Sequence, residues 1–214
     1  MTDKFQNSFR IQSARAQWWN YGWNASYFVT ICSAHREHFF GEIINGNDEN
    51  QPIMQLSEIG QLAGKFWWSI PEHFPFVKLD AFLVMPNHIH GILMIDKPDD
   101  GHDMDGIGDM GGIDVETGQC PVSTNATNNA ANAANEPKTP GELRFRNQGK
   151  DTLSSIVGSF KSVVTKYAHR IHAEFEWQER FHDHIIRDVD EYCRIANYIE
   201  NNVANWHDDK FYEP

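Results

Sequence analysis

Residues 77–95 read VKLDAFLVMPNHIHGILMI, and this stretch decides the fold. It contains two apolar runs, residues 77–85 and residues 88–95, separated by only Pro86 and Asn87. Proline and asparagine are common turn residues, and an apolar run on either side of a short turn is typical of a hairpin. The stretch therefore predicts two antiparallel strands joined by a tight turn.

Further strands and helices are predicted on both sides of this hairpin. Residues 26–32 (SYFVTIC) and 38–43 (HFFGEI) are rich in aromatic and β-branched residues, which predicts strands, and residues 182–187 (HDHIIR) predict a short one. Three stretches carry apolar residues at helical spacing and predict amphipathic helices, the first and last with Ser57 and Asp188 as N-caps: residues 56–70, 152–171 and 189–202. The mixture predicts an α+β domain.

One segment differs from the rest in composition. Residues 97–149 are rich in Gly, Asp, Asn, Ala and Pro and nearly lack aromatic residues, so they cannot bury enough apolar surface to offset the entropy of ordering. We interpret the chain as a single domain, residues 1–214, interrupted by a mobile insertion at about 97–149. Residues 96–141 carry nine acidic and two basic residues, a net −7 of the chain's −12.

Charge and composition bound the possible functions. A net charge of −12 does not by itself predict a nucleic-acid partner, so any DNA site must be a local basic patch. No apolar run approaches the roughly 18 to 20 residues that cross a bilayer, and residues 1–15 do not resemble a signal peptide. Cys32, Cys120 and Cys193 have no metal-binding or redox spacing, which predicts free thiols and a cytoplasmic protein.

The sharpest local signal is His88-Ile89-His90. Residues i and i+2 of a strand point to the same face, so the two imidazoles stand side by side and can ligate one divalent cation. The alternative is a pair of surface or hydrogen-bonded histidines. A second pair, His182 and His184, is a rival metal site.

The last predicted helix offers partners for such a metal. Tyr198 and Asn202 are four residues apart and share a helix face, so the phenol and a carbonyl oxygen suited to Mg2+ or Mn2+ can lie together. The alternative is the ordinary packed face of an amphipathic helix.

Basic residues gather in the second half of the chain with an aromatic residue among them: Lys161, Lys166, Arg170, Arg180, Arg187 and Trp177. Lysine and arginine neutralise phosphates, and aromatic rings stack on unpaired bases, so the set predicts DNA binding. A solvated helix face is the alternative.

Five motifs together resemble a known family: YFVTIC near residue 30, LVMPNHIHGILMI at 83–95, SFKSVVTK at 159–166, WQERFHDHIIRD at 177–188 and YIENN at 198–202. The chain resembles the REP-associated tyrosine transposases of the His-hydrophobe-His single-tyrosine transposase superfamily, over residues 8–98 and 150–206. The resemblance implies a ferredoxin-like antiparallel sheet with helices packed on one face.

The resemblance also implies roles for individual residues. His88 and His90 hold the catalytic metal, Tyr198 is the nucleophile and Asn202 a further ligand, with Val203 where the family has proline. Tyr167 and Tyr192 are alternative candidates for the nucleophile, because each lies on a predicted helix of the same half of the chain. The implied activity is metal-dependent cleavage and rejoining of single-stranded or hairpin DNA through a 5′-phosphotyrosine. The alternatives are a non-catalytic, domesticated hairpin-DNA-binding protein, a replication or mobilisation initiator that only nicks DNA, and an unrelated metal-dependent hydrolase.

Overall fold

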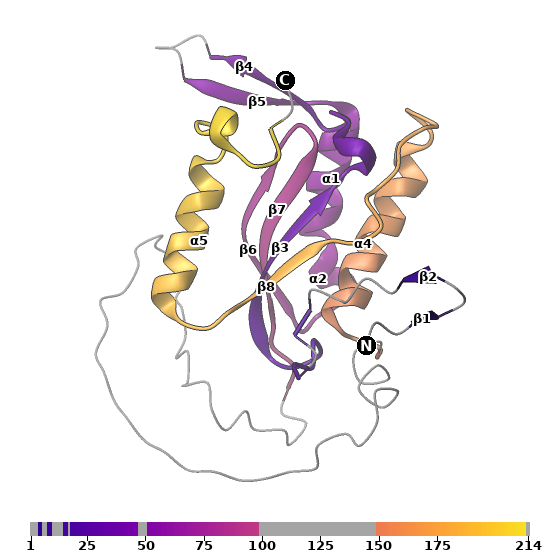
Figure 1. Cartoon of the computed structure of the whole chain (residues 1–214), viewed down its shortest axis with the longest axis vertical. Helices are drawn as coiled ribbons and strands as arrows, with labels where there is room; N and C mark the ends of the chain where they lie inside the picture. The colour runs from indigo at the N-terminus through magenta and orange to yellow at the C-terminus, as the bar shows by residue number, and fades with distance from the viewer. Residues whose placement is uncertain are drawn as a thin grey trace.

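The computed structural model describes four ranges of the chain and the backbone of two short N-terminal strands (Figure 1): residues 15–16, 18–46, 51–98 and 149–212, with β1 (Lys4–Phe5) and β2 (Ser8–Phe9). The predicted mobile insertion lies almost wholly outside these residues, so it stays a prediction, as does the single-domain organisation. Within the described part of the chain, no helix has the length and apolar character needed to cross a membrane.

A four-stranded sheet forms the centre of the fold, in the order β6-β7-β3-β8, with every neighbouring pair antiparallel. Its strands have these bounds: β3 Ala25–Cys32, β6 Val77–Val84, β7 His88–Ile95 and β8 His182–Ile186. Helix α1 (Glu58–Trp68) follows β3, and α4 (Leu153–Ala168) follows β7. This is a split β-α-β arrangement repeated twice, which is the ferredoxin-like topology. The predicted α+β class and the predicted β6–β7 hairpin are confirmed.

Side-chain alternation along β3 and β7 divides the residues between two faces of the sheet. Val29, Ile31 and Ile89 point toward α1 and α4, where they join the main apolar core with Trp67 and Phe160. The two helices cover that face, as the resemblance implied. Helix α5 (Val189–Asn201) lies on the opposite face, so the prediction of helices on one face holds for α1 and α4 and not for α5.

On that second face a smaller core fixes α5. Ile199 of α5 packs against Ile92 of β7 and Ile186 of β8. His88 and His90 lie four and two positions before Ile92 on β7, so their side chains point to the same face of the sheet, the one that α5 covers.

The helix starts follow the predicted caps. Ser57 Oγ accepts a hydrogen bond from the Gly60 amide at 3.1 Å, and Asp188 Oδ1 accepts one from the Glu191 amide at 2.7 Å. Helix α1 begins later than predicted because Leu56 ends a strand, β5 (Pro52–Leu56), which pairs with β4 (Gly41–Asn45). The short helix α2 (Ile70–His73) follows α1.

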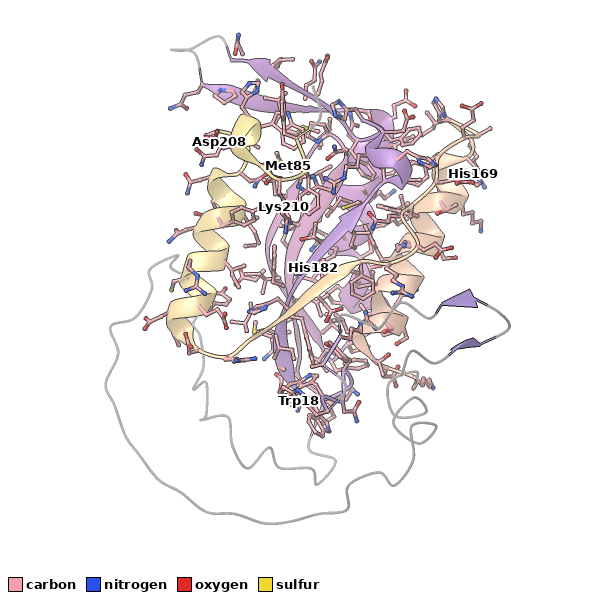
Figure 2. All side chains as sticks on the ribbon, in the orientation of Figure 1. Trp18, Met85, His169, His182, Asp208 and Lys210 are labelled. Atoms are coloured by element: carbon pink, nitrogen blue, oxygen red, sulfur yellow. The ribbon has the colours of Figure 1, made fainter. Side chains whose placement is uncertain are left out.

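The C-terminal segment folds back over the β6–β7 turn. Its 3-10 helix η2 (Trp206–Asp208) leads to Phe211, and both aromatic rings pack against Cys32 and Met85. The Asn87 side-chain amide donates to the Phe211 carbonyl at 2.9 Å and pins the segment to the turn. Figure 2 labels Met85, Asp208 and Lys210 in this region. The sequence did not predict this cover.

The cysteines differ from the prediction. Cys32 is a buried free thiol, but Cys193 is disulfide-bonded, and Cys120 lies outside the described residues. The prediction of free thiols is therefore wrong for Cys193, because a pairing set by spatial proximity leaves no mark in cysteine spacing.

Candidate active site

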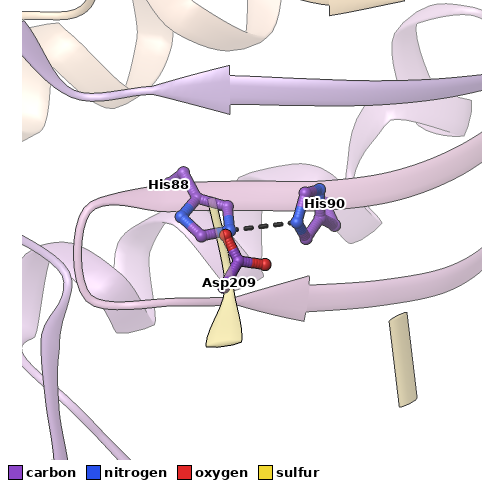
Figure 3. Close-up of side chains that lie close together, drawn as sticks. All are labelled: His88, His90 and Asp209. Atoms are coloured by element: carbon purple, nitrogen blue, oxygen red, sulfur yellow. Dashed lines mark hydrogen bonds between the residues drawn. The ribbon is translucent and has the colours of Figure 1, made fainter. Parts of the chain in front are cut away.

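Strand β7 places His88 and His90 side by side, as the spacing predicted. Their Nε2 atoms are 3.0 Å apart (Figure 3), and the two residues are 0% and 1% exposed. A pair of exposed surface histidines is therefore excluded. Because a buried imidazole needs a partner for each ring nitrogen, the surroundings of the pair decide what it can bind.

Neighbouring side chains set the orientation of both rings. The Asn87 side-chain Nδ2 donates to the Phe211 carbonyl, so the Oδ1 of Asn87 is the atom that faces His88 Nδ1, at 2.8 Å. An amide oxygen only accepts, so His88 Nδ1 carries the hydrogen and Nε2 presents a lone pair. On the other ring, His90 Nδ1 lies 2.9 Å from Thr30 Oγ1, a hydroxyl that can accept. When Thr30 accepts, two Nε2 lone pairs point at the same spot, as in a metal site supported by outer hydrogen bonds.

Burial keeps both imidazoles neutral. Loss of hydration, followed by the positive charges of Arg36 and Lys210, lowers the pKa of His88 to about 3. Burial and the neighbouring His88 likewise hold the pKa of His90 well below its usual value. A neutral imidazole is the form that ligates a metal, so the pair needs no deprotonation at neutral pH.

Tyr198 of α5 reaches this pair. Its hydroxyl lies 3.3 Å from His90 Nε2 and donates to Asp209 Oδ2 at 2.8 Å. The residue is 40% exposed, so it is not an apolar core tyrosine. Burial of the hydroxyl, with a further contribution from the Asp209 carboxylate, raises the pKa of Tyr198 above its ordinary value. The phenol is thus protonated at rest, with a carboxylate placed to accept its proton.

A carboxylate completes a group that could hold a metal ion. His88, His90 and Asp209 each offer one ligand atom, all within 4.8 Å of one another (Figure 3). The side chain of Asn202 donates from Nδ2 to Asp209 Oδ2 at 2.7 Å, which places its amide against the group. Asn202 Oδ1 is buried and has no hydrogen-bond partner among the described residues.

The donor set of two imidazoles and one carboxylate fits a divalent cation, whereas Asn202 contacts Asp209 through its Nδ2, which is a hydrogen-bond donor and not a metal ligand. Imidazole nitrogens favour first-row transition ions, whereas carboxylate and amide oxygens favour Mg2+ and Mn2+.

Asp209 is the site residue that sequence reasoning missed. It follows Asp208 in a polar, non-periodic segment, and nothing local distinguishes the two acids. Only the fold-back of the C-terminal segment turns Asp209 toward the histidines, whereas Asp208 stays exposed.

The other candidate tyrosines and histidines lie elsewhere. Tyr167 belongs to α4 and stacks on Phe66, beyond the opposite face of the sheet, and Tyr192 packs beside the small core under α5. His184 Nε2 bonds Glu191 Oε1 at 2.8 Å. Within the described ranges, the group of His88, His90 and Asp209 is the one set of His, Cys, Asp or Glu residues with metal-binding geometry.

The structure does not gather the predicted DNA-binding residues into one patch. The Lys161 ammonium donates to the Gln178 carbonyl, and the Trp177 indole donates to the Lys161 carbonyl while packing among phenylalanine rings. Lys166 and Arg170 flank the Tyr167 ring on α4, away from the histidine face. Arg180 and Arg187 are exposed near the two ends of β8. DNA binding by these residues stays a prediction.

Comparison with known proteins finds a full-length relative. An uncharacterized protein of Haemophilus influenzae is 32% identical over 216 residues, which cover 99% of each chain. No family model matches the chain.

Two solved structures are similar in fold. One is the REP-associated tyrosine transposase bound to a REP hairpin, with 16% identity and a TM-score of 0.49 over 90% of this chain and 72% of that one. The other is a putative transposase from Deinococcus radiodurans R1, with 11% identity and a TM-score of 0.39 over 90% and 97% of the two chains. Neither TM-score reaches 0.5, and this likeness carries no conclusion about function.

Proposed function

We propose that the chain, which belongs to one family with the uncharacterized Haemophilus influenzae protein, is a metal-dependent DNA strand transferase. In this proposal Tyr198 attacks a phosphodiester of single-stranded or hairpin DNA beside His88 and His90, as in a single-tyrosine transposase. The observation that carries the proposal is the convergence of a tyrosine hydroxyl, two neutral imidazoles and a carboxylate from three separate segments of the chain.

A divalent ion, Mg2+ or Mn2+, would be held by His88, His90 and Asp209 with help from Asn202. When bound, it supplies Lewis-acid stabilisation of the charge that develops on the phosphoryl oxygens. Zn2+ is the competitor, because imidazoles favour it.

The residues of the chain account for the proton of the nucleophile. The Tyr198 hydroxyl already donates to Asp209 Oδ2, so the carboxylate can take the phenolic proton while the Oη–P bond forms. The P–O3′ bond breaks, its electron pair stays on the 3′ oxygen, and that oxygen takes a proton from solvent. The phosphotyrosine linkage retains the energy of the phosphodiester, so another 3′ hydroxyl can attack the phosphorus, lose its proton to solvent and break the Oη–P bond without a nucleotide cofactor. The Tyr198 oxygen then takes back the proton held by Asp209.

One observation favours the non-catalytic alternative, a hairpin-DNA-binding protein. The Phe211 ring lies 4.6 Å from the His88 ring and 6.0 Å from the His90 ring, between centroids, and helps to cover the pair. Entry of a phosphate requires this ring to move aside. A binding protein without catalysis would need no such movement.

Covalent capture of DNA tests the proposal. The protein is incubated with labelled hairpin oligonucleotides whose single-stranded flanks are randomised, with Mg2+ or Mn2+, and adducts are resolved on a denaturing gel. We expect an adduct with the wild type and with Tyr192→Phe, and none with Tyr198→Phe or after chelation of the metal.

Two results would redirect the interpretation. Adducts at the wild-type level with Tyr198→Phe would refute the nucleophile. Cleavage without joining to a second DNA end would identify the initiator-type nickase instead.

A further inference from the structure

A third histidine faces the candidate active site. Thr30 of β3 pairs with His90 of β7 on one side and with His182 of β8 on the other. Directly paired residues on antiparallel neighbours point to the same face, so His90, Thr30 and His182 form one row across the sheet. His90 and Thr30 are buried, whereas His182, which is labelled in Figure 2, is exposed, and its side chain has no hydrogen bond or ion pair among the described residues.

Positive charge lies next to this row. Lys210 Nζ and Arg36 Cζ are each 4.7 Å from the centroid of the Phe211 ring, which packs on His88 and His90. Lys210 is therefore one aromatic ring away from the histidine pair. Burial, and after it the Lys210 charge, lowers the pKa of His182; burial and His88, with a smaller contribution from Lys210, lower the pKa of His90 at the other end of the row.

Three of the neighbouring carboxylates are already engaged, whereas Asp208 is exposed. Asp183 points to the other face and pairs with Arg15 at 2.8 Å, and Glu191 accepts from His184. Asp209 belongs to the metal-binding group. The surface beside the site therefore favours an anion, although the whole chain carries −12.

The direction of attack relates this surface to the substrate. Helix α5 makes most of its sheet contacts with β6 and β7, and the Tyr198 ring lies against His90 of β7 and Phe28 of β3, so His182 on the edge strand β8 lies on the side away from the main contacts of α5. In-line displacement places the leaving oxygen on the side of the phosphorus away from the nucleophile. In the proposed function, the strand that ends in the leaving 3′ oxygen would therefore run across β3 toward β8.

We infer that His182 and Lys210 form a second phosphate position, which holds the phosphate next to the scissile one on the leaving strand. An ammonium and an imidazole N–H both donate to phosphate oxygens, and neither requires a particular base. The position would fix the path of the strand while Tyr198 reacts. This inference rests on the proposed function and names where its substrate lies.

The inference is tested by combining changes in the protein with changes in the DNA and measuring binding alone. All proteins carry Tyr198→Phe and no metal is added, so failure of the cleavage chemistry does not affect the result. A hairpin substrate selected by the wild-type protein is made with one neutral methylphosphonate, either next to the scissile phosphate on the leaving strand or on the opposite side of it. Affinity is measured by fluorescence anisotropy, with His182→Ala and Lys210→Ala combined. His73→Ala, an exposed histidine on α2, is the matched control.

We expect the leaving-strand methylphosphonate to weaken binding roughly threefold to tenfold in the parent and the His73→Ala control. It should have no further effect when His182 and Lys210 are both absent. The double variant should also lower the salt dependence of binding by about 0.7 per lost contact. Additive effects of the DNA and protein changes, or coupling to the opposite side of the scissile phosphate, would overturn the inference.

Discussion

The hydroxyl oxygen of Tyr198 lies 3.3 Å from His90 Nε2, although 108 positions separate the two residues. The fold explains this contact. Strand β7 presents the histidine on the face that α1 and α4 leave free, and α5 crosses that face on the small core around Ile199. Because the hydroxyl has two polar partners and the residue is partly exposed, packing alone does not account for its position.

Removing the histidine pair should separate metal binding from DNA binding. His88→Ala combined with His90→Ala deletes both imidazole ligands, so Mn2+ affinity should fall by about 100-fold or more, while hairpin binding is retained. Isothermal titration measures the metal and anisotropy measures the DNA. His73→Ala should change neither, and unchanged Mn2+ affinity in the double variant would show that the pair is not the metal site.

Two adjacent acids provide a matched comparison. Asp209 contacts Tyr198 and Asn202, whereas Asp208 is exposed. Asp209→Asn keeps the shape but removes the charge, so we expect Mn2+ affinity to drop about 10-fold or more and adduct formation to slow. Asp208→Asn should behave as the wild type. Equal effects of the two changes would remove Asp209 from the site.

The start of α5 should lose stability at low pH through Glu191. Burial opposes ionisation of this carboxyl, but bonds from the Arg187 amide and the His184 ring outweigh it, so its pKa lies below the ordinary value. A depressed pKa contributes stability above the unfolded-state pKa of about 4.3, and that stability is lost as the pH falls through the folded-state pKa.

Glu191→Gln should therefore lower the free energy of unfolding by about 1 kcal/mol at neutral pH. The difference from the wild type should shrink at acidic pH. Urea titrations at several pH values measure it, with the exposed Glu200→Gln as control. A difference that stays constant with pH would contradict the ionic contribution.

The strand that carries the histidines depends on a close approach at Gly91. A Cβ at this position would lie 2.3 Å from Trp67 Cζ2, and Trp67 is fully buried. Gly91→Ala should cost about 1–3 kcal/mol of stability by overpacking the core. Gly158→Ala on α4 meets nothing within 4 Å and should stabilise the protein by about 0.5–1 kcal/mol. Chemical denaturation compares the two, and effects of equal sign would refute this account of the core.

Local patterns predicted the parts of the fold that local interactions determine. The turn at Pro86 and Asn87 marked the β6–β7 hairpin, and the period of two in a strand placed His88 and His90 on one face. The caps at Ser57 and Asp188 are confirmed because each hydrogen bond closes within three residues.

The unpredicted parts depend on contacts between distant segments. The cover over the site requires Cys32, Met85, Trp206 and Phe211 to meet, and no local period records such a meeting. Trp177 shows the same limit. The sequence pattern of an aromatic residue in a polar loop is the same whether the ring stacks on a nucleobase or packs in the core. Here the Trp177 ring packs against Phe40 and Phe175.

Identification of the DNA-linked tyrosine tests the central claim most directly. Trypsin places the three candidates on different peptides: Tyr198 on residues 195–210, Tyr192 on residues 188–194 and Tyr167 on residues 167–170. Mass spectrometry of the nuclease-trimmed adduct should find the nucleotide phosphate on the peptide of residues 195–210, attached to Tyr198. A nucleotide on either of the other peptides, or no tyrosine-linked nucleotide in a preparation that cleaves DNA, would contradict the account.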